Sequence, residues 1–409
     1  MSYVCGATCY HCGKKWPLSK ITYTCPDCEG NVELIYDYAK IKQICHPKYF
    51  QQNHDYSMWR YQPLLPVNEC GMISLQIGWT PLYRVKQEAG VKLYIKDEGR
   101  NPSASLKDRA SAVALIHARE SGAKKVTAAS TGNAGSSMSC LSANIGMPAV
   151  IFVPRKAPEA KIAQLLIFGA RILMVNGTYD DAFDLCLKVS KEFGWYNRNT
   201  GYNPYTREGK KTCAMEICEQ LGWRVPDWVL VSVGDGNILS GLWKGFRDLK
   251  EIGMIDRLPK LAGVQSTTSN AIAQAVERVK AGQALEIRPV NATTIADSIS
   301  VDLPRDGLAA AQAILNSQGV AVQVSDEEIL QAMPCLARQT GVFGEPAGAT
   351  AFAGFGKMRA MNLLKENETV VCVITGSGLK DVATAIKVAG TGTVIDPTLD
   401  AVKKLLSKA

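Results

Sequence analysis

Lys107 is the residue whose position most suggests chemistry, within the segment NPSASLKDRASAVAL at residues 101–115. The preceding segment VKLYIKDE has Val91, Leu93 and Ile95 at alternate positions, which predicts a half-buried strand. The apolar residues that follow recur at helical spacing, so Lys107 is expected at a strand-to-helix turn. Helix N-termini carry partial positive charge, which lowers the pKa of a lysine there. A neutral amine suits Schiff-base chemistry, although a lysine that simply extends into solvent is the ordinary alternative.

Four of the thirteen cysteines form two Cys-X-X-Cys pairs that are separated by twelve residues. They are Cys9, Cys12, Cys25 and Cys28. Each pair offers two thiolates on one tight turn, and two such turns can close a tetrahedral zinc site. Four protein ligands leave no open position, so the zinc would be structural rather than catalytic. Cys5 and His11 are alternatives for one ligand, and a redox pair or a site without metal is the alternative interpretation.

Three other turns combine glycine with small polar residues after a predicted strand. They contain Ser130, Thr131, Gly132, Asn133 and Ala134, then Gly234, Asp235, Gly236 and Asn237, then Thr375, Gly376, Ser377 and Gly378. Glycine-rich turns at helix N-termini hold anions through backbone N–H groups, although one such turn is often only a tight connection. None has the spacing of a nucleotide P-loop, and GDGNIL does not fit the dinucleotide fingerprint. Together with Lys107, these turns predict one shared binding site.

The elements that must position these turns alternate along most of the chain. Short apolar segments such as AKKVTAAS, PAVIFVP, DWVLVSVG and ETVVCVITG are separated by helix-like segments. This alternation predicts an α/β fold with a mainly parallel sheet and helices on both faces. In such sheets ligands bind at the carboxyl ends of the strands, where the predicted turns lie.

The composition excludes several classes of protein. The chain has 409 residues, 46% hydrophobic and 21% charged, with a net charge of +8 and no long basic run. No segment approaches the roughly 18 uninterrupted apolar residues of a membrane span. We therefore expect a cytoplasmic protein with neither a nucleic-acid nor a membrane partner. The nine cysteines outside the pairs are expected to be reduced.

The sequence resembles the threonine synthase branch of the pyridoxal-phosphate enzymes that share the fold of the tryptophan synthase β-subunit. The motifs GWTPL, NPSASLKDR, STGNAG, EGKKT, VGDGN, EPAGA and TGSGLKD occur in family order over nearly the whole chain. The resemblance implies two parallel-sheet α/β domains with helices on both faces, a small N-terminal zinc ribbon and a homodimer. The implied parts are a zinc-ribbon-like segment (1–37), an arm and the first part of the large domain (38–120), a small α/β domain (121–200) and the remainder of the large domain (201–409).

The resemblance also implies roles for the residues of the turns, with pyridoxal 5′-phosphate as cofactor. Lys107 would bind the cofactor as a Schiff base and later move protons, and Asn133 would hydrogen-bond the 3′ oxygen of the ring. Thr375, with Ser377 as the alternative, would face the pyridine nitrogen. A hydroxyl there makes the ring a weaker electron sink than a carboxylate does, which favours elimination and replacement over transamination. The cofactor phosphate would lie against Gly234, Asp235, Gly236 and Asn237.

The implied reaction converts phosphohomoserine and water into threonine and phosphate. The implied substrate-binding residues are Ser130, Thr131, Gly132, Asn133, Ala134 and Arg207. The sequence departs from the family pattern, because Ala134 replaces the threonine of STGNT and Thr206 replaces the arginine of NPYR. Charge-assisted hydrogen bonds are each worth roughly 1.5–3 kcal/mol, so phosphate binding would weaken unless Arg207 and Lys210 compensate.

Two alternatives stay open at this point. The segment TIADSISVDLP resembles threonine and serine dehydratases, which favours β-elimination or β-replacement on another hydroxy- or phospho-amino acid. A non-catalytic binding protein on an enzyme scaffold is the other alternative, although the retention of Lys107, Asn133 and Thr375 argues against it. In either case the cysteine pairs supply no catalytic group, so the cofactor site is expected to be largely independent of the metal.

Overall fold

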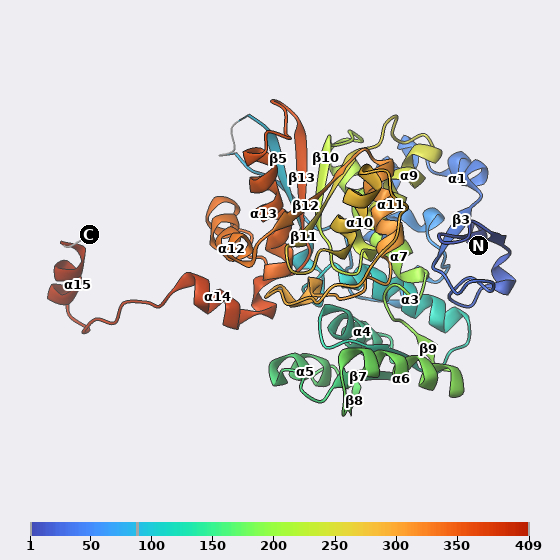
Figure 1. The fold of residues 1–409 in the computed structure, drawn as a ribbon, viewed down its shortest axis with the longest axis horizontal. Helices are drawn as coiled ribbons and strands as arrows, with labels where there is room; N and C mark the ends of the chain where they lie inside the picture. The colour runs from blue at the N-terminus through green and yellow to red at the C-terminus, as the bar shows by residue number, and fades with distance from the viewer. Residues whose placement is uncertain (1, 87–89, 408–409) are drawn as a thin grey trace.

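Three β-sheets organise the computed structural model, which describes residues 2–86 and 90–407 (Figure 1). The largest sheet has six strands in the order β12-β11-β10-β13-β5-β4, and the second has four in the order β8-β7-β6-β9. The third sheet is antiparallel, lies at the N-terminus and has the order β2-β1-β3. Its strands are β1 (Val4–Cys9), β2 (Lys15–Trp16) and β3 (Val32–Tyr36).

The six-stranded sheet is buried on both faces, as its nearly continuous apolar strands predict. Val229 and Val231 of β10 face one core cluster, whereas Trp228 and Leu230 face the other. The strands are β4 (Leu82–Arg84), β5 (Lys92–Asp97), β10 (Trp228–Ser232), β11 (Lys260–Ser266), β12 (Val320–Val324) and β13 (Thr369–Ile374).

Helices cover both faces of this sheet. One core cluster joins it to α8 (Thr212–Gln220), α9 (Asn237–Glu251), α10 (Ala271–Lys280) and α11 (Gly307–Asn316). The other joins it to α12 (Asp326–Thr340) and α13 (Pro346–Ala360). Next to the first group lie α3 (Lys107–Glu120) and α7 (Tyr205–Lys210), which pack against each other.

The four-stranded sheet is parallel and is also covered on both faces. Its strands are β6 (Val126–Ala129), β7 (Ala149–Pro154), β8 (Arg171–Val175) and β9 (Tyr196–Asn197). One face packs against α4 (Asn133–Asn144) and α5 (Glu159–Leu166), and the other against α6 (Tyr179–Glu192). This unit lies below the large sheet in Figure 1.

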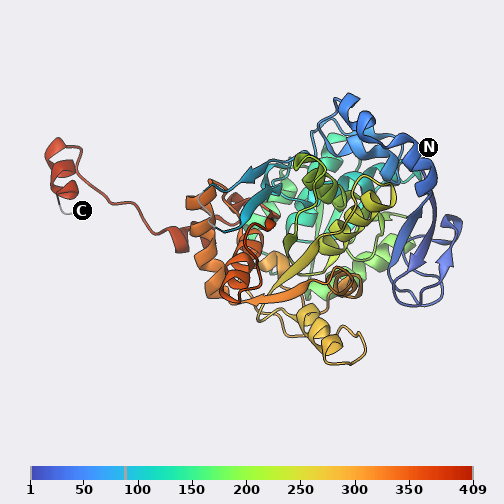
Figure 2. The same ribbon diagram turned by 90° about the horizontal axis from the view of Figure 1, so that it is seen from above.

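The two ends of the chain lie on opposite sides of the molecule (Figure 2). The N-terminal sheet lies against the body and is followed by α1 (Tyr38–Ile44) and α2 (Pro47–Gln52). At the other end, α14 (Val382–Ala389) leads to an extended segment and to α15 (Leu399–Leu406), which projects away from the body.

The predicted α/β fold with helices on both faces is confirmed, with one correction to its parallel sheets. Strand β4 runs antiparallel to β5 at the edge of the large sheet. A short connection joins these two strands, whereas parallel neighbours need a long crossover, so β4 and β5 form a hairpin-like pair. Within the described ranges, no helix is long and apolar enough to cross a lipid bilayer.

Candidate active site

Lys107 is the first residue of α3, at the turn that follows β5, as its sequence context predicts. The backbone N–H of Leu106 donates to the carbonyl oxygen of Thr375 (2.9 Å), which holds this turn against the end of β13. The carboxylate of Asp108 accepts hydrogen bonds from the N–H (2.6 Å) and hydroxyl (2.5 Å) of Ser103. These contacts hold the loop before the helix in place and thereby fix the backbone position of Lys107.

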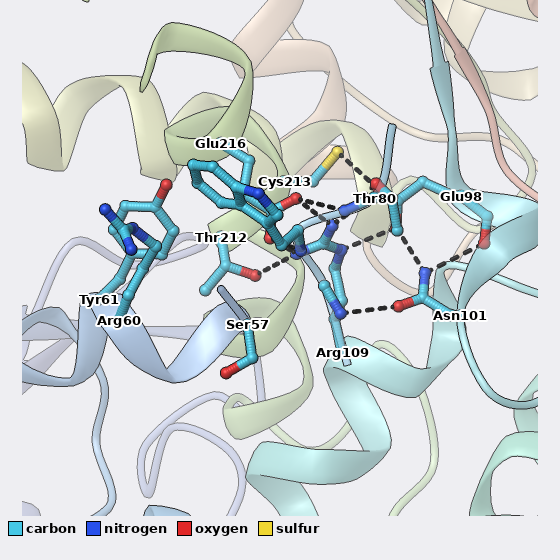
Figure 3. A network of polar contacts seen from close by, with 12 residues as sticks. Ser57, Arg60, Tyr61, Thr80, Glu98, Asn101, Arg109, Thr212, Cys213 and Glu216 are labelled. Atoms are coloured by element: carbon cyan, nitrogen blue, oxygen red, sulfur yellow. Dashed lines mark hydrogen bonds and ion pairs between the residues drawn. The ribbon is translucent and has the colours of Figure 1, made fainter. Parts of the chain in front are cut away.

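A buried ionic network anchors the same end of α3 from the other side (Figure 3). Arg109 donates to Glu98 through Nε (2.7 Å) and to Glu216 through Nη1 (2.6 Å), and Lys96 donates to Glu216 (2.8 Å). Two cations thus face two carboxylates, and all four side chains are fully buried. Because Arg109 follows Lys107 by two residues, the network ties the lysine's turn to β5 and α8.

The four turns selected from the sequence meet at one cavity of about 640 Å³. Such a volume lies in the range of roughly 300–1,000 Å³ that is typical of small-molecule sites. The cavity lies where β6, β10 and β13 end, between the two parallel sheets. The selected residues that line it are Lys107, Ser130, Thr131, Gly132, Asn133, Ala134, Gly234, Asp235, Gly236, Asn237 and Thr375.

The amine of Lys107 is held in a state that favours nucleophilic attack. Burial, followed by the nearby charge of Arg198, lowers its pKa to about 8, while Glu345 and Asp235 oppose this change. Its side chain makes no hydrogen bond to any residue of the described chain. Besides the helix N-terminus that the sequence predicts, burial and a neighbouring guanidinium act on this amine.

The turn before α9 is shaped for close approach of a ligand to the backbone. Gly236 has a φ of +92°, and a Cβ there would lie 2.8 Å from the carbonyl oxygen of Asp306. A Cβ on Gly234 would lie 2.7 Å from the Cα of Ile299. The side chain of Asn237 is fixed, because its Oδ1 accepts from Lys210 Nζ (2.5 Å) and its Nδ2 donates to Asp306 (2.9 Å).

Asp235 brings a carboxylate to this same turn. Its Oδ1 accepts from the backbone N–H of Arg305 (2.5 Å). Burial and the nearby charge of Asp306 raise its pKa to about 6, against the opposing effects of Lys210 and Lys107. The turn therefore combines a backbone that is open to close approach by a ligand with a carboxyl group whose pKa is raised to about 6.

Asn133 and Thr375 both line the cavity. Asn133 Nδ2 donates to Glu345 Oε1 (2.6 Å) and to Ser298 Oγ (3.4 Å). The hydroxyl of Thr375 lies 3.4 Å from that of Ser232. Glu345 is a residue of the cavity that the sequence did not predict, although a lone acid before the apolar run PAGATAFAGF is a visible signal. Burial raises the pKa of this carboxyl.

Arg207 is not part of the cavity, which corrects its expected role in substrate binding. It is buried, forms an ion pair with Asp306 and donates through Nη1 to the carbonyl oxygen of Val32 (2.8 Å). Thr206 is also buried elsewhere, with its hydroxyl donating to Asn203 O (2.8 Å). Arg207 and Lys210 were the residues expected to compensate for the arginine that Thr206 replaces. Of these two, only Lys210 lines the cavity.

The four paired cysteines come together at the N-terminal sheet. Their sulfur atoms lie within 4.8 Å of one another, with Cys9 and Cys28 at 3.5 Å and Cys12 and Cys25 at 3.7 Å. We call these four residues the cysteine cluster. Cys5 is not a member, because its Sγ donates to Ile35 O (3.4 Å), and His11 is not a member either.

The fold and the cavity together define a pyridoxal-phosphate enzyme. The family model described as "Pyridoxal-phosphate dependent enzyme" matches residues 73–376, and the chain belongs to this family. It is 39% identical to threonine synthase of Methanocaldococcus jannaschii, over 98% of this chain and 99% of the relative. It is 38% identical to threonine synthase of Methanosarcina acetivorans, over 97% and 98% of the two chains. Within the family it is therefore a threonine synthase-like enzyme.

Solved structures with low sequence identity share the fold. Diaminopropionate ammonia lyase from Escherichia coli has a TM-score of 0.65 at 17% identity, covering 82% of this chain and 93% of that chain. The processed form of threonine deaminase isoform 2 from Solanum lycopersicum has a TM-score of 0.63 at 24% identity, covering 76% and 82%. At these identities the likeness concerns the fold alone.

The residues present fit the cofactor of this family. The amine of Lys107, which has no hydrogen-bond partner among the residues that the structure describes, faces the cavity, and an amine is the group that a pyridoxal aldehyde requires. The turn at Gly234 and Gly236 has no room for side chains and begins the fifteen-residue helix α9, which suits a phosphate group.

Proposed function

We propose that this enzyme converts phosphohomoserine and water into threonine and phosphate, with pyridoxal 5′-phosphate as cofactor. The observation that carries the proposal is the unpaired amine of Lys107, which faces a cavity lined by all the selected turns. The likeness to threonine synthases over nearly the whole chain supports the choice of substrate.

In this proposal the residues of the chain position the cofactor. Bound pyridoxal phosphate supplies an aldehyde that captures amines and a ring that withdraws electrons from the α-carbon of the substrate. Asn133 donates toward the 3′ oxygen of the ring, and the hydroxyl of Thr375 faces the pyridine nitrogen. The backbone of the turn formed by Gly234, Asp235, Gly236 and Asn237 would hold the cofactor phosphate. Because a hydroxyl cannot hold a full positive charge on the ring nitrogen, the site favours elimination and replacement.

The same proposal assigns the substrate contacts. The carboxylate of the substrate lies against Ser130, Thr131 and Gly132, next to the N-terminus of α4, where N–H groups favour an anion. Lys107 removes the proton from the α-carbon and returns protons later. Phosphate leaves the γ-carbon, and water supplies the hydroxyl group at the β-carbon, since threonine carries its hydroxyl there. Lys210 lines the same cavity as Ala134 and is a basic residue that remains there for the substrate phosphate.

The test is phosphate release from phosphohomoserine by the holoenzyme, with threonine measured in parallel. The expected result is equal amounts of phosphate and threonine, and no turnover in Lys107→Ala. Borohydride reduction followed by peptide mapping should place the pyridoxyl group on Lys107. A label at another lysine would overturn the assignment of this residue.

A second candidate is β-elimination from serine or threonine, which yields a 2-oxo acid and ammonia. Residues 297–303, in the segment that resembles dehydratases, line the cavity next to Asn133, and Ser298 accepts a hydrogen bond from it. Release of 2-oxo acid from serine or threonine, with no phosphate from phosphohomoserine, would favour this candidate and reject the first.

We also propose a structural zinc ion in the cysteine cluster, because four thiolates at this spacing suit tetrahedral coordination and leave no open position. Elemental analysis should find one zinc per chain. None of the thirteen cysteines, all of which the structure describes, forms a disulfide, which supports a reducing compartment such as the cytoplasm. A homodimer is proposed from the family resemblance, and sedimentation would test it.

A further inference from the structure

Four arginines are buried in the described part of the chain, and one of them has no acidic partner. Three form ion pairs: Arg60 with Glu219, Arg109 with Glu98 and Glu216, and Arg207 with Asp306. Arg198 is 1% exposed and forms no ion pair with a described residue. A buried charge without a counterion is costly, so packing alone does not explain a guanidinium at this position.

Among the described residues, the hydrogen-bond partners of Arg198 are neutral hydroxyl groups, and the carboxylate of Asp108 is near enough to act on its charge without forming an ion pair. Its Nε donates to Ser111 Oγ (3.1 Å), and its Nη1 donates to Thr200 Oγ1 (2.7 Å). Its Nη2 is buried and has no hydrogen-bond partner among the described residues. Hydroxyl groups fix the orientation of the guanidinium but do not neutralise its charge. The positive charge of Arg198 therefore acts on neighbouring titratable groups.

Arg198 lies where its positive charge acts on the amine of Lys107. Ser111 lies one helical turn after Lys107 on α3, and Thr200 lines the cavity beside the lysine. The guanidinium therefore lies next to the part of α3 that carries the amine. It does not line the cavity itself, so it is not placed to touch a ligand directly.

The other charges that face Lys107 do not substitute for Arg198. Lys210 of α7 is another basic group nearby, but burial, followed by the charges of Lys107 and Arg198, lowers its pKa well below the usual value, and its Nζ is engaged with Asn237. Glu345, before α13, and Asp235, before α9, are the facing acids, and both favour the ammonium form of Lys107. Among the described groups, Arg198 is therefore the charge that opposes the effect of these two carboxyl groups on the amine.

We propose that Arg198 is a positioning residue whose charge, which no ion pair with a described residue neutralises, raises the fraction of Lys107 that is present as the neutral amine near neutral pH. This inference rests on the proposed function of Lys107 as the cofactor-binding amine. Repulsion between like charges favours the neutral amine, as lysine nucleophiles require. The lowered pKa of Lys107 agrees in direction, with Arg198 as the nearby charge that contributes most to it.

The test measures the pKa of Lys107 directly in the full-length chain after removal of the cofactor. Labelling with 1-fluoro-2,4-dinitrobenzene over pH 6–10, with peptide mass spectrometry, gives the rate at Lys107. Recovery of cofactor absorbance on re-addition checks that the fold is retained. In the wild type the midpoint should lie near 8. In Arg198→Met it should rise by about one unit, which makes labelling at pH 7 about tenfold slower.

Three variants separate this role from a structural one. Arg198→Lys keeps the charge and should restore much of the shift, and Ser111→Ala should give a smaller rise by loosening the guanidinium. Arg60→Met removes a buried arginine whose partner is Glu219, so it should lower stability and leave the midpoint unchanged. Because Arg198→Met removes an unpaired charge, it should raise the melting temperature of the cofactor-free chain.

The outcomes also separate this inference from the proposed function. Labelling of Lys107 with the same midpoint in the wild type and Arg198→Met would overturn the role of Arg198 alone. An equal shift in Arg60→Met would also overturn it, since a structural effect would then explain both. If borohydride reduction places the pyridoxyl group on another lysine, the proposed function itself fails.

Discussion

At the scale of single residues, Asp235 is the least expected group in the cavity. It belongs to the turn proposed to hold the cofactor phosphate, where a carboxylate would repel a dianion. The carboxyl group titrates with a pKa of about 6, so it is mostly charged at pH 7.5 and mostly neutral at pH 5.5. Repulsion between this carboxylate and the phosphate should therefore grow as the pH rises through 6.

Replacement of Asp235 by asparagine tests this repulsion. We expect Asp235→Asn to bind pyridoxal phosphate about tenfold more tightly at pH 7.5, which corresponds to about 1.4 kcal/mol. The gain should shrink toward pH 5.5, where the wild-type carboxyl is already neutral. Equilibrium dialysis across this range measures both effects. Asp302→Asn, which changes an exposed carboxylate at the cavity, is the control and should change affinity little. Weaker binding in Asp235→Asn at every pH would contradict the argument.

The sequence was sufficient to select most residues of the cavity but not the pairing of its charges. Lys107 and the three turns were recognised because each follows a strand, which is a local property. Arg207 was misassigned because its partner, Asp306, lies 99 residues further along the chain. Arg198 was missed for the same reason, since the absence of a carboxylate partner can be seen only in three dimensions.

At the scale of elements, the first turn of α3 depends on the network around Arg109. Replacing this arginine leaves Glu98 and Glu216 with only Lys96 as a facing cation. Breaking a buried pair in this way costs about 3–5 kcal/mol. We expect Arg109→Met to lower the free energy of unfolding by this amount, measured by urea denaturation. Arg257→Met, at an exposed pair with Asp227, should cost under about 1 kcal/mol. Equal losses in the two variants would contradict this view of the network.

The N-terminal sheet is joined to the turn proposed to hold the cofactor phosphate more directly than its sequence suggests. Asn31 Nδ2 donates to Arg305 O (2.6 Å) and to Asp306 Oδ1 (3.0 Å), and Asp306 in turn accepts from Asn237. Gly30, the residue before Asn31, is packed against the cluster, since a Cβ there would lie 3.2 Å from Cys9 Sγ. The contacts thus oppose the expectation that the cofactor site is independent of the metal.

Metal removal should therefore weaken the cofactor site. We expect a chelator, or Cys9→Ser, to raise the dissociation constant of pyridoxal phosphate about tenfold, as lost hydrogen bonds worth about 1 kcal/mol each would do. Asn31→Ala should weaken binding similarly while zinc content, measured by elemental analysis, stays unchanged. Lys14→Ala removes an exposed ion pair with Asp27 and is the control. Unchanged affinity in Asn31→Ala would show that the contact with Arg305 and Asp306 does not support the turn.

At the scale of the whole molecule, the alternation of strands and helices was sufficient to predict the α/β class but not the arrangement of the sheets. Strands distant in sequence are neighbours, because β13 lies between β10 and β5. No local pattern specifies such neighbours, since they follow from how the helices pack on each face.

The junction between the six-stranded and the four-stranded sheet is likewise visible only in the folded chain. There, His117 of α3 contacts Tyr196 of β9 (Nδ1 to Oη, 2.9 Å) and stacks on Tyr205 of α7.

This junction should make the fold sensitive to acid. Burial lowers the pKa of His117 to about 4, whereas a histidine in the unfolded chain has a pKa near 6.5. Between these values the unfolded state binds the proton and the folded state does not, so stability falls as the pH drops from 6.5 to 4. The loss is about 2–3 kcal/mol, given that the ring is not fully buried.

We expect His117→Phe to retain the stacking and to show a smaller loss of stability between pH 7 and pH 4.5, measured by urea unfolding. His54→Gln, at an exposed histidine, should keep the full loss, and an undiminished loss in His117→Phe would show that other groups cause the acid sensitivity.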